Sequence, residues 1–314
     1  MSLAFLFPGQ GSQAVGMGAE LAEAFAPARE VFQEVDDALG QNLSRLMREG
    51  PEDQLTLTEN AQPALMAVSL AVMRVLEREF GVGVEKAAFV AGHSLGEYSA
   101  LAAAGAISLA DTARLLKLRG QAMQRAVPVG AGAMASLIGP KTDVALAEEA
   151  AAAGAKFGVC VVANDNNQGN VVISGAKAAV DAAIERAKEL GARAIPLNVS
   201  APFHCPLMQP AADEMAEALA AATILAPRAP VVANITARPT NDPEAIRRLL
   251  VEQVTGRVRW RESVLWLAGE GGVGRFAEAG AGKVLSGMVK RISPEAEATP
   301  LNAPADLEAF CQSL

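Results

Sequence analysis

The stretch AGHSLGEYSA, residues 91–100, places Ser94 between two glycines, each two residues away. The residues KAAFVAG (86–92) predict a buried strand, and the alanine-rich residues from Leu95 to about Ala104 predict a helix. A strand, a sharp turn at serine and then a helix form the context that a nucleophile elbow requires. The free N–H groups and positive dipole end of that helix favour a developing oxyanion. The pattern predicts a nucleophilic serine, but it leaves open whether the ester goes to water or to another acceptor.

The composition narrows the class of protein. The chain has 314 residues, 51% of them hydrophobic, which is enough for one large domain or a large and a small one. The net charge of −8 argues against binding to nucleic acid or to an anionic membrane surface. No stretch is long and apolar enough to span a bilayer, and the first residues, MSLAFLFPGQ, lack the positive region of a signal peptide. We therefore expect a protein of the cytoplasm.

The cysteines and histidines are too few and too scattered to suggest a metal site. Cys160, Cys205 and Cys311 are far apart, so neither a disulfide framework nor metal-ligand spacing is expected. The segment GQGSQA (9–14) fits part of a dinucleotide-binding pattern, but a helix-like segment follows where a second strand is required. We expect no metal and no cofactor.

The rest of the chain predicts an α/β fold with an insertion. LAFLF (3–7) reads as a buried strand that leads into a glycine-rich loop. Further strands are expected at 231–236 and 274–280, and helices at about 17–40, 61–80, 108–126, 207–222, 242–254, 260–269 and from 283. In residues 130–199 the predicted elements follow the order β-α-β-β-α-β, which is the ferredoxin-like motif, and DNNQG (165–169) is the predicted hairpin connection. The predicted domains are 1–128 with 200–314, and 129–199.

A serine hydroxyl needs a base, and the chain has two histidines, His93 and His204. His93 is adjacent to Ser94, where side chains point apart, so we interpret it as a packing or positioning residue. His204 lies in SAPFHCPLM (200–208) between two prolines, which stiffen the loop as a base held in one pose requires. The alternative is a histidine that caps the following helix.

One arginine lies on the apolar face of a predicted helix. In the helix that begins at Ser108, Arg119 shares the stripe of Leu115, Leu116, Ala122 and Met123. Arginine is almost never buried unpaired, so Arg119 needs a carboxylate or phosphate partner from the protein or from a ligand. It is either part of a structural ion pair, a side chain reaching out at the edge of the stripe, or a clamp for an acidic substrate.

Several motifs together resemble one family. They are FLFPGQGSQ (5–13), GHSLGEYSAL (92–101), LLKLRGQAMQ (115–124), VVISG (171–175), SAPFHCPLM (200–208) and VEQVTGRVRW (251–260). In this order they resemble the malonyl-CoA:acyl-carrier-protein transacylases of fatty-acid synthesis and the related acyltransferase domains of polyketide synthases. The resemblance covers essentially the whole chain, and it implies an α/β-hydrolase-like large domain with an inserted ferredoxin-like small domain.

The resemblance also implies roles for individual residues. Ser94 and His204 correspond to the family's catalytic pair, and Arg119 to the arginine that binds the malonyl carboxylate. The family's oxyanion hole falls on the backbone N–H groups of Gln10 and Leu95. Gln253 corresponds to the residue whose backbone carbonyl orients the histidine.

The implied reaction is ping-pong transfer of malonyl from malonyl-CoA, a substrate, to the phosphopantetheine thiol of acyl-carrier protein. The sequence does not indicate the oligomeric state, and a monomer is the default expectation. Phe203 is expected to crowd an α-methyl branch, which favours malonyl over methylmalonyl, and Asn170 departs from a common glutamine in a predicted pocket wall. The alternatives are a serine thioesterase or other hydrolase, a polyketide-type enzyme with another extender unit, and a non-catalytic acyl-binding protein.

Overall fold

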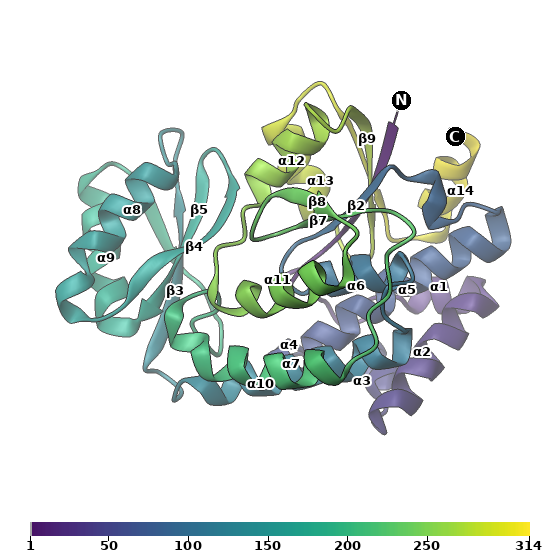
Figure 1. Ribbon diagram of the computed structural model, residues 1–314, viewed down its shortest axis with the longest axis horizontal. Helices are drawn as coiled ribbons and strands as arrows, with labels where there is room; N and C mark the ends of the chain where they lie inside the picture. Colours follow the sequence, from purple (N-terminus) through teal and green to yellow (C-terminus); the bar gives the residue numbers. More distant parts are fainter. Residues whose placement is uncertain (1) are drawn as a thin grey trace.

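The computed structural model describes residues 2–314 and contains two separate sheets in a mixed α/β fold (Figure 1). The large sheet has the order β10-β9-β1-β2-β7-β8 and the small sheet the order β4-β5-β3-β6. The strands of the large sheet are β1 (Ser2–Phe7), β2 (Phe89–Gly92), β7 (Val231–Ala233), β8 (Arg238–Thr240), β9 (Val273–Ala279) and β10 (Glu297–Leu301).

The helices around the large sheet come from both ends of the chain. Those before the small sheet are α1 (Ala19–Ala24), α2 (Ala26–Leu39), α3 (Leu43–Glu49), α4 (Glu52–Thr56), α5 (Thr58–Phe80), η1 (Val84–Lys86), α6 (Gly96–Ala103) and α7 (Leu109–Ala126). Those after it are η3 (Pro206–Met208), α10 (Gln209–Ala221), α11 (Pro243–Thr255), α12 (Trp260–Ala268), α13 (Val284–Ile292) and α14 (Pro304–Gln312).

Strand β1 is buried on both faces, which explains its uninterrupted apolar sequence. Its alternate residues Leu3, Phe5 and Phe7 pack into the larger core, to which α2, α5 and α7 contribute. Ala4 and Leu6 point the other way, into a second core formed with α12 and α13. The large sheet is therefore covered by helices on both sides (Figure 1).

The parallel pairing of β1 with β2 brings two loops together. Phe7, the last residue of β1, lies opposite Gly92, the last residue of β2. The backbone N–H of His93 then donates to the carbonyl of Phe7 at 3.0 Å. In open α/β sheets, ligands bind at the carboxyl ends of the strands. The loop after β1 and the turn at Ser94 therefore share the edge where a site is expected.

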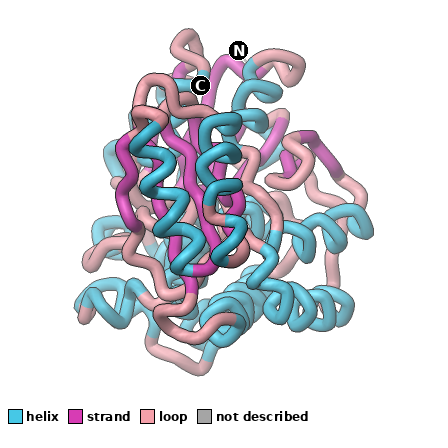
Figure 2. The backbone as a smooth tube through the Cα atoms, turned by 90° about the vertical axis from the view of Figure 1, so that its left-hand side faces the viewer, coloured by secondary structure: helices cyan, strands magenta, loops and turns pink. Residues whose placement is uncertain are grey.

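The predicted β-α-β-β-α-β order of the middle segment is confirmed. It consists of β3 (Gly132–Ile138), α8 (Val144–Ala153), η2 (Ala155–Phe157), β4 (Cys160–Asn167), β5 (Asn170–Ala176), α9 (Lys177–Glu189) and β6 (Arg193–Pro196). All strand pairs are antiparallel, and α8 and α9 pack on one face of the sheet (Figure 2). A backbone bridge between Asn164 and Val258 joins this sheet to the rest of the fold.

Some element predictions were wrong. The single helix expected over 17–40 is two helices, because Phe25 is extended between α1 and α2, and Pro27 occupies the first turn of α2. Strand β4 continues to Asn167, so only the end of the expected DNNQG connection is a turn. The prediction missed α3 and α4, which are too short to show a helical period, and also β8, β10 and α14.

No helix within residues 2–314 is both long enough and apolar enough to cross a membrane.

Candidate active site

Ser94 sits at the tight turn that the sequence predicts. It follows β2 and precedes α6, and its φ of 54° lies in the left-handed region that non-glycine residues rarely adopt. A Cβ built on Gly92 would lie 1.9 Å from the backbone carbon of Gly96, and one on Gly96 would lie 2.2 Å from the carbonyl oxygen of Phe7. Both glycines are therefore required by close backbone contacts, and they leave the Ser94 side chain outside the sheet.

His204 lies against the serine hydroxyl. Its Nε2 is 2.7 Å from Ser94 Oγ, although the two residues are 110 positions apart. Its Nδ1 is 2.9 Å from the backbone carbonyl oxygen of Gln253, which can only accept a hydrogen bond. Nδ1 must therefore carry the proton, which leaves Nε2 free to accept the proton of Ser94. His204 also has a left-handed backbone, with φ of 56°.

The electrostatics favour a neutral imidazole. His204 is 3% exposed. Burial, followed by the positive charge of Arg119, lowers the pKa of His204 to about 3. The imidazole is therefore uncharged at neutral pH, as a proton acceptor for Ser94 must be.

Arg119 lies beside the same hydroxyl, from α7. It is 1% exposed, and its Nη2 is 3.3 Å from Ser94 Oγ. Nη1 donates to Gln62 Oε1 at 2.7 Å and Nη2 to Gln253 Oε1 at 2.9 Å. Among residues 2–314 no carboxylate forms an ion pair with it, so the expected acidic partner is not supplied by the described chain. A buried cation held by neutral amides is suited to receive a carboxylate from a ligand.

The two predicted oxyanion donors flank the serine from two different loops. Leu95 directly precedes α6, and Gln10 lies in the loop after β1. A Cβ on Gly9 would lie 2.6 Å from the carbonyl oxygen of His93, so this loop is in close contact with the turn at Ser94. Within the described chain, neither the N–H of Gln10 nor that of Leu95 has an acceptor. Both therefore remain available to a ligand oxygen.

A buried polar network that the sequence did not predict surrounds the turn. Asn234 Oδ1 accepts from the N–H of Ser94 at 2.8 Å, and its Nδ2 donates to the carbonyl of Gly92 at 2.7 Å. Glu97 Oε2 accepts from the N–H of Asn234 at 3.0 Å and from Gln253 Nε2 at 2.8 Å. A lone charged residue in the otherwise uncharged helix α6 was the available signal for Glu97.

Replacing Glu97 with Gln should change how stability depends on pH. Burial, which outweighs the hydrogen bonds from Asn234 and Gln253 and the charge of Arg119, raises the pKa of Glu97 to about 7. The folded state thus holds this proton more tightly than the unfolded state, so this contribution is present at low pH and is lost as the pH rises from about 4.5 to about 7. Between pH 5 and 8 the free energy of unfolding of Glu97→Gln, relative to the unmodified protein, should rise by about 2–3 kcal/mol.

Denaturant unfolding of both proteins at the two pH values measures this difference. A matched change at the exposed Glu308 controls for the loss of one charge. An equal difference between the two proteins at both pH values would contradict the expectation.

These residues enclose a cavity of about 270 Å³. Ser94, His204, Arg119, Gln10 and Leu95 all line it. The remaining wall includes the apolar side chains of Met123, Met134, Leu197, Val199 and Phe203, together with polar ones such as Gln62 and Asn164. The structure therefore brings these five predicted residues together around one space, and Gln253 lies behind them as the partner of His204.

The structure also places His93 and Asn170. His93 is not turned toward Ser94: its Nε2 is 2.9 Å from Asn166 Oδ1, and its ring is 5.5 Å from that of Trp260. This agrees with the interpretation of His93 as a packing residue. Asn170 does not line the cavity. Its Oδ1 accepts from Ser136 Oγ at 2.9 Å within the small sheet, whereas Asn164 of the same sheet does line the cavity.

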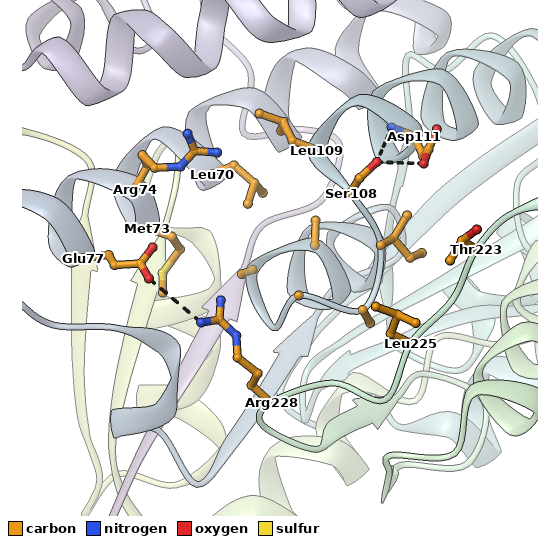
Figure 3. A pocket seen from close by; sticks show the side chains of 15 residues that line it. Leu70, Met73, Arg74, Glu77, Ser108, Leu109, Asp111, Thr223, Leu225 and Arg228 are labelled. Atoms are coloured by element: carbon orange, nitrogen blue, oxygen red, sulfur yellow. Dashed lines mark hydrogen bonds and ion pairs between the residues drawn. The ribbon is translucent and has the colours of Figure 1, made fainter.

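A larger cavity of about 420 Å³ lies elsewhere, between α5, the loop after α6 and residues 223–228 (Figure 3). None of the predicted site residues lines it. Its charged side chains already have partners: Arg228 Nη1 lies 3.9 Å from Glu77 Oε1, Arg74 pairs with Glu34, and Asp111 bonds Ser108 at the start of α7. Size alone therefore does not identify the site. Within residues 2–314 no group of three or more potential metal ligands comes together.

Comparisons with known proteins agree on one family. The family model described as "Acyl transferase domain" matches residues 4–298. The chain is 46% identical over 307 residues to the malonyl CoA-acyl carrier protein transacylase of Salmonella typhimurium, covering 98% of this chain and 97% of that protein. The crystal structure of an acyl-carrier-protein S-malonyltransferase from Bartonella henselae superimposes with a TM-score of 0.97 at 55% identity and covers 100% of this chain and 99% of that one.

A further solved structure contains a partner. It shows a malonyl-transacylase in complex with its type II PKS acyl-carrier protein. That chain is 43% identical to this one, with a TM-score of 0.96 and 100% of both chains covered.

Proposed function

The chain belongs to the acyl transferase family, among the malonyl CoA-acyl carrier protein transacylases, and from this membership we propose how its residues move malonyl from malonyl-CoA to acyl-carrier protein. The observation that carries the proposal is the position of Arg119. Its buried guanidinium lies 3.3 Å from the hydroxyl of Ser94 and has neutral partners. A cation beside the nucleophile selects an acyl group that ends in a carboxylate, because that carboxylate leaves no buried charge unpaired.

In the first half of the reaction, Ser94 becomes acylated. His204 Nε2 takes the proton of Ser94 Oγ, and Oγ attacks the thioester carbon of malonyl-CoA. The N–H groups of Gln10 and Leu95 bind the resulting oxyanion, and loss of one such donor typically costs about 10²–10³ in rate. The C–S bond then breaks, and CoA leaves as a thiol that carries the proton from His204.

The second half reverses these steps with a different thiol. The phosphopantetheine thiol of acyl-carrier protein gives its proton to His204 and attacks the malonyl ester. The C–O bond to Ser94 breaks, and Oγ recovers its proton from His204. Arg119 holds the malonyl carboxylate throughout, so the same geometry serves both half-reactions.

The main rival is a serine hydrolase, which would use the same serine and histidine. In such enzymes the histidine is usually oriented by an Asp or Glu. Here His204 Nδ1 donates to the backbone carbonyl of Gln253. Together with Arg119, this favours the transferase.

We also infer selectivity for an unbranched malonyl group. Phe203 is buried and lines the cavity, as do Met123 and Leu197. A phenyl ring in that wall leaves little room for an α-methyl branch. Methylmalonyl-CoA should therefore acylate Ser94 more slowly than malonyl-CoA does.

The finer architecture supports the same proposal. We infer that residues 1–128 and 200–314 form an α/β-hydrolase-like domain and that 129–199 form an inserted ferredoxin-like domain. The large sheet, parallel except for its edge strand β8, and the wholly antiparallel small sheet of order β4-β5-β3-β6 support this division. We further propose that the enzyme acts as a cytoplasmic monomer and needs no cofactor.

The test is the fate of the acyl group on the unmodified enzyme. Intact-protein mass is measured after brief mixing with malonyl-, methylmalonyl- or acetyl-CoA, followed by a chase with buffer or with acyl-carrier protein. We expect one malonyl adduct that acyl-carrier protein removes much faster than water does. An adduct discharged equally by both chases would indicate a hydrolase, and no adduct from any donor would indicate a non-catalytic acyl-binding protein.

A further inference from the structure

The carboxylate of Glu97 lies beneath the active site without touching the cavity. Glu97 is 2% exposed and is the only charged residue of α6. Its Oε2 accepts from Gln253 Nε2 at 2.8 Å and from the backbone N–H of Asn234 at 3.0 Å. Neither the proposed reaction nor the substrate uses this carboxylate directly, yet burying it is costly. Its partners therefore indicate its role.

The first partner, Gln253, connects Glu97 to Arg119. Gln253 Nε2 also donates to the carbonyl of Ser94 at 3.0 Å, while its Oε1 accepts from Arg119 Nη2 at 2.9 Å. Two acceptors on one side and a donor on the other fix the direction of the amide. In the reverse direction its NH₂ group would face the guanidinium, and its oxygen would face two other oxygens. Glu97 supplies one of the two acceptors that prevent this reversal.

The second partner, Asn234, connects Glu97 to the turn at Ser94. The carboxylate holds the backbone of Asn234, whose side chain bonds the N–H of Ser94 and the carbonyl of Gly92. One oxygen atom of Glu97 therefore restrains both the nucleophile's loop and, through Gln253, the arginine beside it.

We propose that Glu97 is a positioning residue for acyl-group selection: it fixes the Gln253 amide so that Arg119 points at the carboxylate of the acyl group. This inference rests on the proposed function, because it assumes that Arg119 receives that carboxylate. It predicts that losing the acceptor at position 97 harms transfer of a carboxylate-bearing acyl group more than transfer of one without it.

The experiment compares rates of Ser94 acylation by malonyl-CoA and acetyl-CoA, followed by intact-protein mass at one pH. In Glu97→Ala the malonyl-to-acetyl ratio should fall by about 10- to 100-fold, the range typical when a partner that orients a ligand-binding side chain is lost. Glu97→Gln keeps an acceptor oxygen at the same place, so its ratio should stay within about threefold of the unmodified enzyme. A purely structural role would lower both rates together and leave the ratio unchanged.

A double-mutant cycle tests whether the effect passes through the Gln253 amide. Gln253→Met removes the amide but keeps the backbone carbonyl that bonds His204. Adding Glu97→Ala to it should lower the ratio no further. Ser99→Ala is the matched control, because Ser99 is another buried polar residue of α6 and its hydroxyl has no partner in the described chain.

The outcomes separate this inference from the proposed function. If the unmodified enzyme forms no malonyl adduct, the proposed function fails. If it does, but Glu97→Ala leaves the ratio unchanged, only the role of Glu97 is overturned. Should Glu97→Ala not fold, Glu97→Asp, which withdraws the carboxylate by one methylene, must lower the ratio for the inference to stand.

Discussion

We expect an enzyme carrying Ser94→Ala to take up no malonyl group from malonyl-CoA, and its rate of transfer to acyl-carrier protein should fall by at least about 10⁴-fold, as is typical when a serine nucleophile is removed. The reason is the geometry around the hydroxyl. His204 Nε2 lies 2.7 Å from Ser94 Oγ, so without that oxygen the proposed base has no proton to accept, and the proposed oxyanion donors, the N–H groups of Gln10 and Leu95, have no intermediate to bind. Intact-protein mass spectrometry after rapid mixing and quenching measures the malonyl adduct, and a coupled assay measures the transfer of malonyl to acyl-carrier protein.

The effects of replacing Ser94 and of replacing His204 should not add. Because His204 acts only on the proton of Ser94 and of the incoming thiol, Ser94→Ala combined with His204→Ala should be hardly slower than Ser94→Ala alone. A malonyl adduct that persists in Ser94→Ala would place the nucleophile elsewhere and would overturn the proposed reaction.

Replacing Arg119 with Met is expected to reverse the enzyme's choice of acyl group. The specificity constant kcat/KM for malonyl-CoA should fall by roughly 30- to 5,000-fold, the equivalent of about 2–5 kcal/mol for truncating one partner of a buried charge pair. Acetyl-CoA has no carboxylate, so its acylation of Ser94 should be kept or should improve as the cavity wall becomes apolar. The rates of Ser94 acylation by malonyl-CoA and by acetyl-CoA measure this change in preference.

The matched control for this change lies on the same helix. Arg114 is exposed and pairs with Asp111 at 3.1 Å, so Arg114→Met should leave both acylation rates nearly unaltered. If the Arg119→Met enzyme still prefers malonyl-CoA over acetyl-CoA, the guanidinium does not bind the carboxylate of the acyl group. The serine hydrolase would then be the better account of the site.

The site residues were predictable to different degrees. Ser94 and Arg119 were predictable from the local pattern. Ser94 lies between two glycines at the junction of a strand and a helix, and Arg119 is a charged residue on the apolar face of a helix. His204 followed from there being only two histidines. Gln10, Leu95 and Gln253 came from the family resemblance, because a backbone N–H or carbonyl leaves no mark on the amino-acid sequence.

The supporting network was not predictable for a physical reason. Asn234 contacts Ser94 across 140 positions, and Gln253 contacts Glu97 across 156. These side chains follow no period, and even where one lies in a motif, only the fold decides which groups it meets. The large elements were predicted because buried strands and long amphipathic helices repeat over many residues. The short helices α3 and α4 have too few residues to show such a repeat.

The acyl cavity takes its walls from both sheets. Met134 and Asn164 belong to the small sheet, whereas Ser94 and Arg119 are carried by the elements around the large one. A small rotation of one sheet against the other would therefore widen or narrow the space for the acyl chain. Residues 127–131, the first of the two chain segments that cross between the sheets, do not line this cavity, whereas the second segment carries Phe203 and His204. Substitutions in the first segment therefore offer evolution a route to new substrates that leaves the catalytic machinery intact.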